Sequence, residues 1–224
     1  MDLLDAFKFW DTQLFLLINR IHAPFFDGIM YAVSYKLTWV PLYISILYFV
    51  IKQWKHEAIW IVLALILCIV ISDQVSSDLL KNLVKRLRPS HAENLKGLIH
   101  LVKGYSGGRY GFASSHAANA FGFALLSSLF VKRKVYSYAI FIWALITAYS
   151  RIYLGVHFPL DVLGGVVVGS LAALSCFVTI RKYRPAVLQL NKENQSIETN
   201  ESFIPVIVLA LSFIAIIFYC LFVF

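Results

Sequence analysis

The segment EAIWIVLALILCIVISDQVSSDLL, residues 57–80, decides the fold class. No charged residue occurs between Ala58 and Ile71, and the first one after this apolar run is Asp73. A helix needs about 20 predominantly apolar residues to cross the hydrocarbon core of a bilayer. The segment therefore predicts a membrane-spanning helix, which becomes more polar toward its end and continues to Lys85.

The rest of the 224-residue chain has the same character. Hydrophobic residues make up 60% of it and charged residues only 14%, against about 25% charged residues in a soluble domain. Five further stretches are apolar enough for spans, at 25–51, 115–131, 135–153, 159–180 and 203–223. The sequence predicts one all-α domain over residues 1–224, a polytopic bundle of six transmembrane helices.

Two segments outside these spans have a different composition. In residues 1–22, apolar side chains recur at helical spacing between charged ones, which favours an amphipathic helix lying in the membrane interface. An ordinary packed helix is the alternative. Residues 185–202 are rich in Asn, Glu and Ser, and they predict a flexible polar connection on the cytoplasmic side.

The basic connections predict the orientation. Three short ones, Lys52–Lys55, Lys132–Lys134 and Arg181–Arg184, fall on one side of a six-span bundle. The positive-inside rule makes that side cytoplasmic. Loop 86–113 is also basic, so a count of charges alone does not decide the orientation. We place this loop on the outer side because we expect its cations to bind an anionic ligand. In a bacterium the chain would lie in the inner membrane with this loop in the periplasm.

The net charge of +8 is explained by topology and by an anionic substrate, and nucleic acid is not expected as a partner. Cys68, Cys176 and Cys220 all lie inside apolar runs. Their spacing fits neither a disulfide framework nor a zinc site, so we interpret them as buried thiols.

Three polar clusters lie at the ends of predicted spans. In the first, Lys81, Lys85 and Arg88 are spaced at i, i+4 and i+7 before Pro89. On a helix ending at the proline they would share one face and form a cationic stripe. The alternative is that these side chains extend to the lipid headgroups.

The second cluster, Ala113-Ser114-Ser115-His116, opens the span at 115–131. Serine before an apolar run is a helix N-cap signal, and backbone N–H groups at a helix start can bind phosphate. A histidine placed there can exchange protons near neutral pH.

The third cluster runs from Ser150 to Asp161. His157 and Asp161 are four residues apart, so the carboxylate can fix the imidazole tautomer and leave the other ring nitrogen for attack. Arg151 offers a planar fork of donors for phosphate oxygens. A tight turn with a capping Asp is the structural alternative.

Together the clusters supply a nucleophile, an orienting carboxylate, a proton donor and a charge clamp, which is the inventory for phosphoryl transfer. Two His and one carboxylate could also form a metal triad, but the neighbouring Lys and Arg side chains would repel a cation. We expect no metal and no cofactor.

The chain resembles the type 2 phosphatidic acid phosphatase superfamily of membrane lipid phosphatases. Its signatures are K-x6-R-P, P-S-G-H and S-R-x5-H-x3-D. The first is present as Lys81 to Arg88-Pro89 and the third as Ser150-Arg151 to Asp161. In the second, Ala113 replaces Pro and Ser115 replaces Gly, and a left-handed backbone at Ser115 would carry strain of about 1–3 kcal/mol.

The resemblance implies roles for eight residues. His157 would be the nucleophile, Asp161 would orient it, and His116 would protonate the leaving oxygen. The phosphoryl oxygens would be held by Lys81, Arg88, Ser114, Ser115 and Arg151.

The implied function is hydrolysis of a lipid phosphomonoester or diphosphate through a phosphohistidine. Undecaprenyl diphosphate is the first choice of substrate and a lipid A phosphate the second. A lipid phosphotransferase and a non-catalytic transporter or binding protein for lipid headgroups are the alternatives.

Overall fold

The computed structural model describes residues 3–189 and 200–223, and every regular element in this part of the chain is a helix. The predicted all-α class is confirmed. Among these described residues, four helical runs are long and apolar enough to cross a membrane, and one apolar helix is shorter. The four are Lys36–Val84, Lys134–Tyr153, Pro159–Tyr183 and Ile204–Phe222, and the shorter one is Ser115–Val131. The protein is an integral membrane protein.

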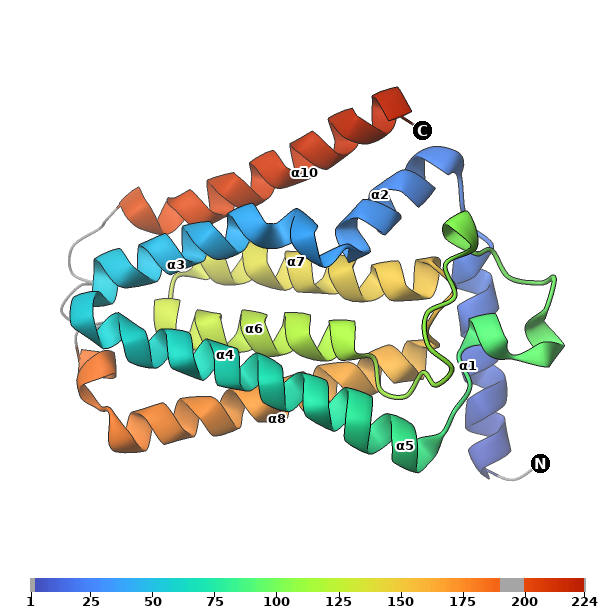
Figure 1. Cartoon of the computed structure of the whole chain (residues 1–224), viewed down its shortest axis with the longest axis horizontal. Coiled ribbons are helices and arrows are strands. Elements are labelled where there is room, and N and C mark those ends of the chain that lie inside the picture. Colours follow the sequence, from blue (N-terminus) through green and yellow to red (C-terminus); the bar gives the residue numbers. More distant parts are fainter. Residues whose placement is uncertain (1–2, 190–199, 224) are drawn as a thin grey trace.

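The run Lys36–Val84 reverses direction within itself. Helix α3 (Val40–Trp54) ends at Lys55, whose φ is +50°, and a short 3-10 turn η2 (Lys55–Glu57) leads into α4 (Ala58–Gln74). Figure 1 shows α3 and α4 side by side in opposite directions. The run therefore contributes two antiparallel helices, α3 and α4, to the bundle.

The predicted first span, 25–51, is broken in the structure. Its first part is α2 (Pro24–Ser34), which is followed by the 3-10 turn η1 (Lys36–Trp39) and then by α3. Tyr35 between them has extended backbone. Pro41 lies in the first turn of α3, where a proline is tolerated because its missing N–H would have no helical partner.

The second half of the bundle is α6 (Ser115–Val131), α7 (Lys134–Tyr153), α8 (Pro159–Tyr183) and α10 (Ile204–Val223). Gly165 and Gly169 let α8 approach α6 closely. A Cβ atom at Gly165 would clash with the carbonyl oxygen of Ser114, and one at Gly169 would clash with that of Ala118. This close approach brings the first turn of α8 beside the first turn of α6.

Helix α1 (Leu3–Asn19) lies across one end of the bundle (Figure 1). The side of α1 that carries Asp11, Phe15 and Asn19 is buried. The predicted apolar stripe points away from the protein, with exposed side chains at Leu3, Phe7, Trp10, Leu14 and Leu17. Helix α1 thus packs on the bundle through one face and presents the other, apolar face outward.

Loop 86–113 lies at the same end as α1. It contains three short 3-10 turns, η4 (Pro89–His91), η5 (Glu93–Leu95) and η6 (Val102–Gly104). A small apolar cluster joins α1 and this loop to α6, α7 and α8; it consists of Phe15, Leu16, Leu95, Ala117, Ala148, Ile152, Phe158 and Val162. This cluster fixes the loop over the ends of the three helices.

The three short basic connections lie at the opposite end of the bundle (Figure 1). They are the turn between α3 and α4, the turn between α6 and α7, and the end of α8. Of the predicted polar connection 185–202, residues 190–199 lie outside the described part of the chain.

Candidate active site

His157 and Asp161 meet where α7 gives way to α8. Pro159 begins α8, so His157 lies in the link before the helix and Asp161 in its first turn. Oδ2 of Asp161 accepts the N–H of Phe158 at 3.0 Å and lies 3.5 Å from Nδ1 of His157. Both side chains are buried, and Nδ1 has no hydrogen-bond partner that meets normal geometry. Asp161 is therefore the carboxylate that faces this ring nitrogen.

A second carboxylate is tied to Asp161 through Arg86. Nη1 of Arg86 donates to Asp161 Oδ1 at 3.1 Å, and Nη2 donates to Asp11 Oδ2 at 2.6 Å. Asp11 also accepts the N–H of Leu160 at 2.9 Å, and the guanidinium lies 4.1 Å from the ring centre of Phe158. Burial raises the pKa of Asp11, against the opposing effects of the Leu160 N–H and Arg86. The fork of Arg86 holds Asp161 in one orientation.

Neither Asp11 nor Arg86 was predicted as a site residue. A signal for Asp11 was present, because Asp11, Phe15 and Asn19 recur every fourth residue and so share one face of α1. A carboxylate on the same face as a buried aromatic ring needs a partner. Arg86 was noted only as one charge of a basic loop.

Three cations predicted as phosphate ligands surround His157. Arg151 is 2% exposed; its Nη2 donates to the hydroxyl of Tyr105 at 3.1 Å and its Nη1 to that of Ser34. Arg88 donates from Nε to the carbonyl of Tyr110 at 3.0 Å. The charges of Arg88, Arg151 and Lys81 all act on His157. The structure thus brings the first and third motifs to one place.

The cationic stripe predicted for Lys81, Lys85 and Arg88 is wrong. The chain passes through a π-helical turn, η3 (Val75–Leu80), and α5 (Lys81–Val84) ends at Lys85, where φ is +49°. Beyond it the backbone is extended, and the N–H of Arg88 donates to the carbonyl of Arg109 at 3.1 Å. Arg88 is turned into the site by this pairing with the loop, whereas Lys85 is exposed.

The second motif forms the start of α6. Ser114 is the N-cap: its hydroxyl accepts the N–H of Ala117 at 3.5 Å, and its own N–H donates to the Asp161 carbonyl at 2.9 Å. Ser115 is the first residue of α6, and its backbone is helical rather than left-handed. The strain considered for serine at this position is therefore absent.

His116 faces two cavities. One of about 470 Å³ is also lined by Ser34, Lys36 and Tyr105. The other, of about 230 Å³, enters the bundle, where its walls include Trp39, Tyr43, Phe123 and Trp143. Both cavities have mainly apolar walls and share Ser34, Lys36 and His116 as polar groups, which is suited to a ligand with a charged head and an apolar tail.

The charge balance of the site favours an anion. Within residues 3–189 and 200–223, no ion pair involves Lys81, Arg88 or Arg151. Burial, followed by the charges of Arg88 and Arg151, holds the pKa of His157 well below its usual range. The ring is therefore neutral at neutral pH, and a lone pair is available for attack on an electrophile.

A neutral histidine that faces a carboxylate, beside cations without carboxylate partners in the described chain, is an arrangement suited to phosphoryl transfer. Its position at one end of an apolar helical bundle defines a membrane-embedded enzyme of this class. The model of the PAP2 superfamily matches residues 57–185. The chain belongs to this superfamily, and it is a phosphatase.

Three relatives and one solved structure give the context. The chain is 44% identical to Lipid A 4'-phosphatase of Bacteroides thetaiotaomicron over 71% of this chain and 72% of the relative. It is 40% identical to Lipid A 4'-phosphatase of Porphyromonas gingivalis over 71% of this chain and 68% of the relative. It is 27% identical to Undecaprenyl-diphosphatase of Sulfolobus acidocaldarius over 72% of this chain and 74% of the relative.

The crystal structure of LpxE from Aquifex aeolicus is similar to this fold, with a TM-score of 0.58 and 27% identity. The similarity covers 74% of this chain and 93% of that one. The family predicted from three short motifs is thereby confirmed.

Proposed function

We propose that this protein hydrolyses a phosphate ester of a membrane lipid through a phosphohistidine formed on His157. The observation that carries the proposal is the placement of the buried, neutral His157 among Lys81, Arg88 and Arg151, which have no carboxylate partner in the described chain. A bound phosphoryl group would supply the missing negative charge and would complete the site.

In the first step, Nε2 of His157 attacks phosphorus, and the bond from phosphorus to the lipid oxygen breaks. The electron pair leaves with that oxygen, and His116 donates a proton to it. Lys81, Arg88 and Arg151 stabilise the charge that develops on the other phosphoryl oxygens. Ser114 and the N–H of Ser115 at the start of α6 supply further donors to these oxygens.

In the second step, water attacks the phosphohistidine and gives a proton to His116. The P–N bond breaks, its electron pair returns to Nε2, and inorganic phosphate leaves. Asp161 stabilises the imidazolium character that His157 gains during transfer. Arg86 and Asp11 hold Asp161 in place, so we assign them a positioning role. No step requires a metal ion.

Among lipids, we propose a lipid A phosphate as the substrate. Both relatives that are at least 40% identical are named Lipid A 4'-phosphatase, whereas the undecaprenyl-diphosphatase relative is 27% identical. This order reverses the preference reached from the sequence. Exposed Lys36 lines the same two cavities as His116. This additional cation suits a headgroup with more than one negative charge.

We further propose a six-span layout in which α2 with α3, α4, α6, α7, α8 and α10 cross the membrane. The exposed apolar stripe of α1 then lies in the outer interface beside the site, and the basic turns at the far end lie in the cytoplasm. In a bacterial inner membrane the site would face the periplasm. Cysteine substitutions at Lys103 and Arg133, without the native thiols, test this orientation. Only Lys103→Cys should react with an impermeant reagent on intact cells.

Phosphate release from purified protein in detergent tests the function. The panel should contain lipid A, undecaprenyl diphosphate, phosphatidic acid and a soluble phosphomonoester, each with wild type and His157→Ala. We expect release from lipid A to be the fastest and to depend on His157. Equal kcat/KM for the soluble ester and every lipid would contradict the lipid assignment, and transfer to an added alcohol in place of water would establish the phosphotransferase.

A further inference from the structure

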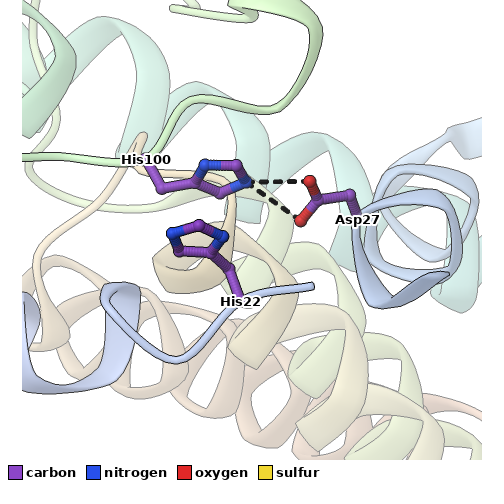
Figure 2. Close-up of side chains that lie close together, drawn as sticks. All are labelled: His22, Asp27 and His100. Carbon is purple, nitrogen blue, oxygen red and sulfur yellow. Dashed lines mark hydrogen bonds and ion pairs between the residues drawn. The ribbon is translucent and has the colours of Figure 1, made fainter. Parts of the chain in front are cut away.

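A second histidine–aspartate cluster lies at the same end of the molecule but has no role in the mechanism above. It consists of His22 in the link between α1 and α2, Asp27 in the first turn of α2, and His100 in loop 86–113 (Figure 2). One potential ligand atom from each side chain lies within 4.8 Å of the other two. Three segments distant in sequence thus converge here.

The separations of the ligand atoms are similar to those around a bound metal. Nε2 of His100 lies 2.9 Å and 3.0 Å from the two oxygens of Asp27, and the rings of His22 and His100 are parallel with centres 3.7 Å apart. In a tetrahedral zinc site with bonds of about 2.0–2.1 Å, ligand atoms lie about 3.3 Å from one another. The His22 ring must turn out of its parallel stack with His100 for its nitrogen to point at the same ion, and its exposed position leaves room for this rotation.

The ligand types select the metal. Two imidazoles and a carboxylate suit Zn²⁺ and similar transition metals, whereas Mg²⁺ and Ca²⁺ prefer oxygen ligands throughout. His22 is exposed and the other two side chains are half-buried, so a water molecule can reach the fourth position. Within the described residues, no Lys or Arg forms an ion pair with Asp27. A cation would therefore be attracted to this cluster.

The groups around the cluster hold its ligands in place. The hydroxyl of Tyr153 donates to Oδ1 of Asp27 at 2.7 Å. Asn19, which is 1% exposed, accepts the N–H of His100 at 2.7 Å and donates to the carbonyl oxygens of His100 and Tyr153 at 3.1 Å and 2.8 Å. Such outer partners orient the ligands of metal sites and raise metal affinity. The backbone of His100 is thus fixed before any ion binds.

We propose that His22, Asp27 and His100 bind one Zn²⁺ ion that has a structural role. The ion would join the α1–α2 link, α2 and loop 86–113, and through Tyr153 it would reach the end of α7. This end leads into the link that carries His157, and a Cβ atom at Gly155 in that link would lie 2.8 Å from the His100 carbonyl oxygen. The ion would therefore steady the wall of the active site without touching the reacting phosphate. The assignment does not depend on the identity of the substrate.

Metal titration of the full chain in detergent tests the proposal. The protein is purified without a histidine tag, stripped with a chelator, and titrated with Co²⁺ as a coloured probe and then with Zn²⁺. We expect one saturable equivalent, the visible absorption of a low-symmetry Co²⁺ site, and a rise in the thermal midpoint with Zn²⁺, because a ligand that binds only the folded state stabilises it.

Variants locate the site. His22→Gln is the main test because His22 is exposed, and we expect it to weaken Zn²⁺ binding at least tenfold and to remove the thermal shift. His91→Gln, in the same loop, is the matched control and should keep both, since Nε2 of His91 lies 3.3 Å from the Gly107 carbonyl oxygen and His91 is not part of the cluster. Absence of a saturable equivalent in the wild type, or equal binding by the two variants, would overturn the proposal.

Discussion

The described part of the chain has two histidine–aspartate pairs at one end of the bundle, and we propose opposite kinds of ligand for them. In the first, Nδ1 of His157 lies 3.5 Å from Asp161, with side chains 1% and 0% exposed. In the second, Nε2 of His100 lies 2.9 Å from Asp27, with side chains 23% and 16% exposed. The residue types are the same, so the surroundings decide what each pair can bind.

Around His157 the surroundings are cationic. Lys81, Arg88 and Arg151 attract an anion, and together with burial they keep the imidazole neutral. Around His100 the neighbours are a second imidazole and the hydroxyl of Tyr153. A His–Asp motif alone therefore does not predict its ligand, whereas the sign of the charges next to it does.

The largest expected difference between the pairs is in turnover. His157→Ala removes the proposed nucleophile, and we expect kcat to fall by about 10⁴-fold or more. His116→Ala should leave at most a trace of activity. In contrast, His22→Gln, in the second cluster, should keep kcat within about threefold of wild type, since surface substitutions usually have small effects.

Initial rates of phosphate release from lipid A, measured on the same protein preparations, make this comparison. Each variant must elute as the wild type does in size-exclusion chromatography. A near-normal rate for His157→Ala would end the assignment of the nucleophile, and a comparable loss in His22→Gln would place the second cluster in the chemistry.

A smaller effect is expected from the network behind Asp161. Arg86→Gln removes the fork between Asp11 and Asp161, and we expect kcat to fall about 10–100-fold, as for other groups that orient a ligand at an active site. KM should change little, because Arg86 acts through Asp161 rather than on the substrate.

Lys85→Gln is the matched control, since Lys85 is adjacent in sequence but exposed. Arg86→Lys keeps the charge but cannot donate to both carboxylates in the same way, so it should restore only part of kcat. A change in KM with kcat intact would instead indicate that Arg86 contacts the substrate.

The depressed pKa of His157 has a consequence for stability. In the folded protein the ring stays neutral, whereas in the unfolded chain it takes up a proton below about pH 6.5. Folding is therefore opposed as the pH falls below that value, by up to about 1.4 kcal/mol per pH unit. His157→Gln lacks this contribution, so its stability should fall less between about pH 7.5 and pH 5.5.

Unfolding of the wild type and His157→Gln in detergent at these two pH values measures the difference. The comparison uses only the change in unfolding free energy between the two pH values, because the substitution also alters packing, and thus stability, at each pH. An identical drop in the two proteins would mean that His157 takes up a proton in the folded protein as readily as in the unfolded chain.

Much of the fold could be predicted from the sequence, since apolar stretches longer than a bilayer crossing leave few alternatives to membrane helices. Gly165 and Gly169 are four residues apart, a pattern that favours close packing of membrane helices, and α8 does approach α6 closely there. The break between α2 and α3 and the end of α5 at Lys85 could not be predicted, because each depends on local backbone geometry that tertiary contacts select.

For the site, three motifs predicted which residues meet, and His157, Asp161, Arg88 and Arg151 do lie together. The sequence did not predict how Arg88 enters the site, because its direction depends on pairing with loop residues more than 20 positions away. The spacing of Asp11, Phe15 and Asn19 indicates that Asp11 lies on a buried face of α1, but it does not identify its partner Arg86, which is 75 residues away. Long-range polar contacts of this kind leave no periodic pattern in one sequence.

The smallest expected effect concerns metal removal, and it separates the two pairs most directly. If cations of the protein perform the electrostatic work at His157, excess EDTA should change kcat by less than about twofold. The same treatment should lower the thermal midpoint by a few degrees, since about 1 kcal/mol of lost stability shifts a chain of this size by about 2–4 °C. His22→Gln should already have the lower midpoint and should not respond to EDTA. Activity that EDTA removes and Zn²⁺ restores in both proteins would place a metal beside His157, and the contrast between an anion site and a cation site would then be wrong.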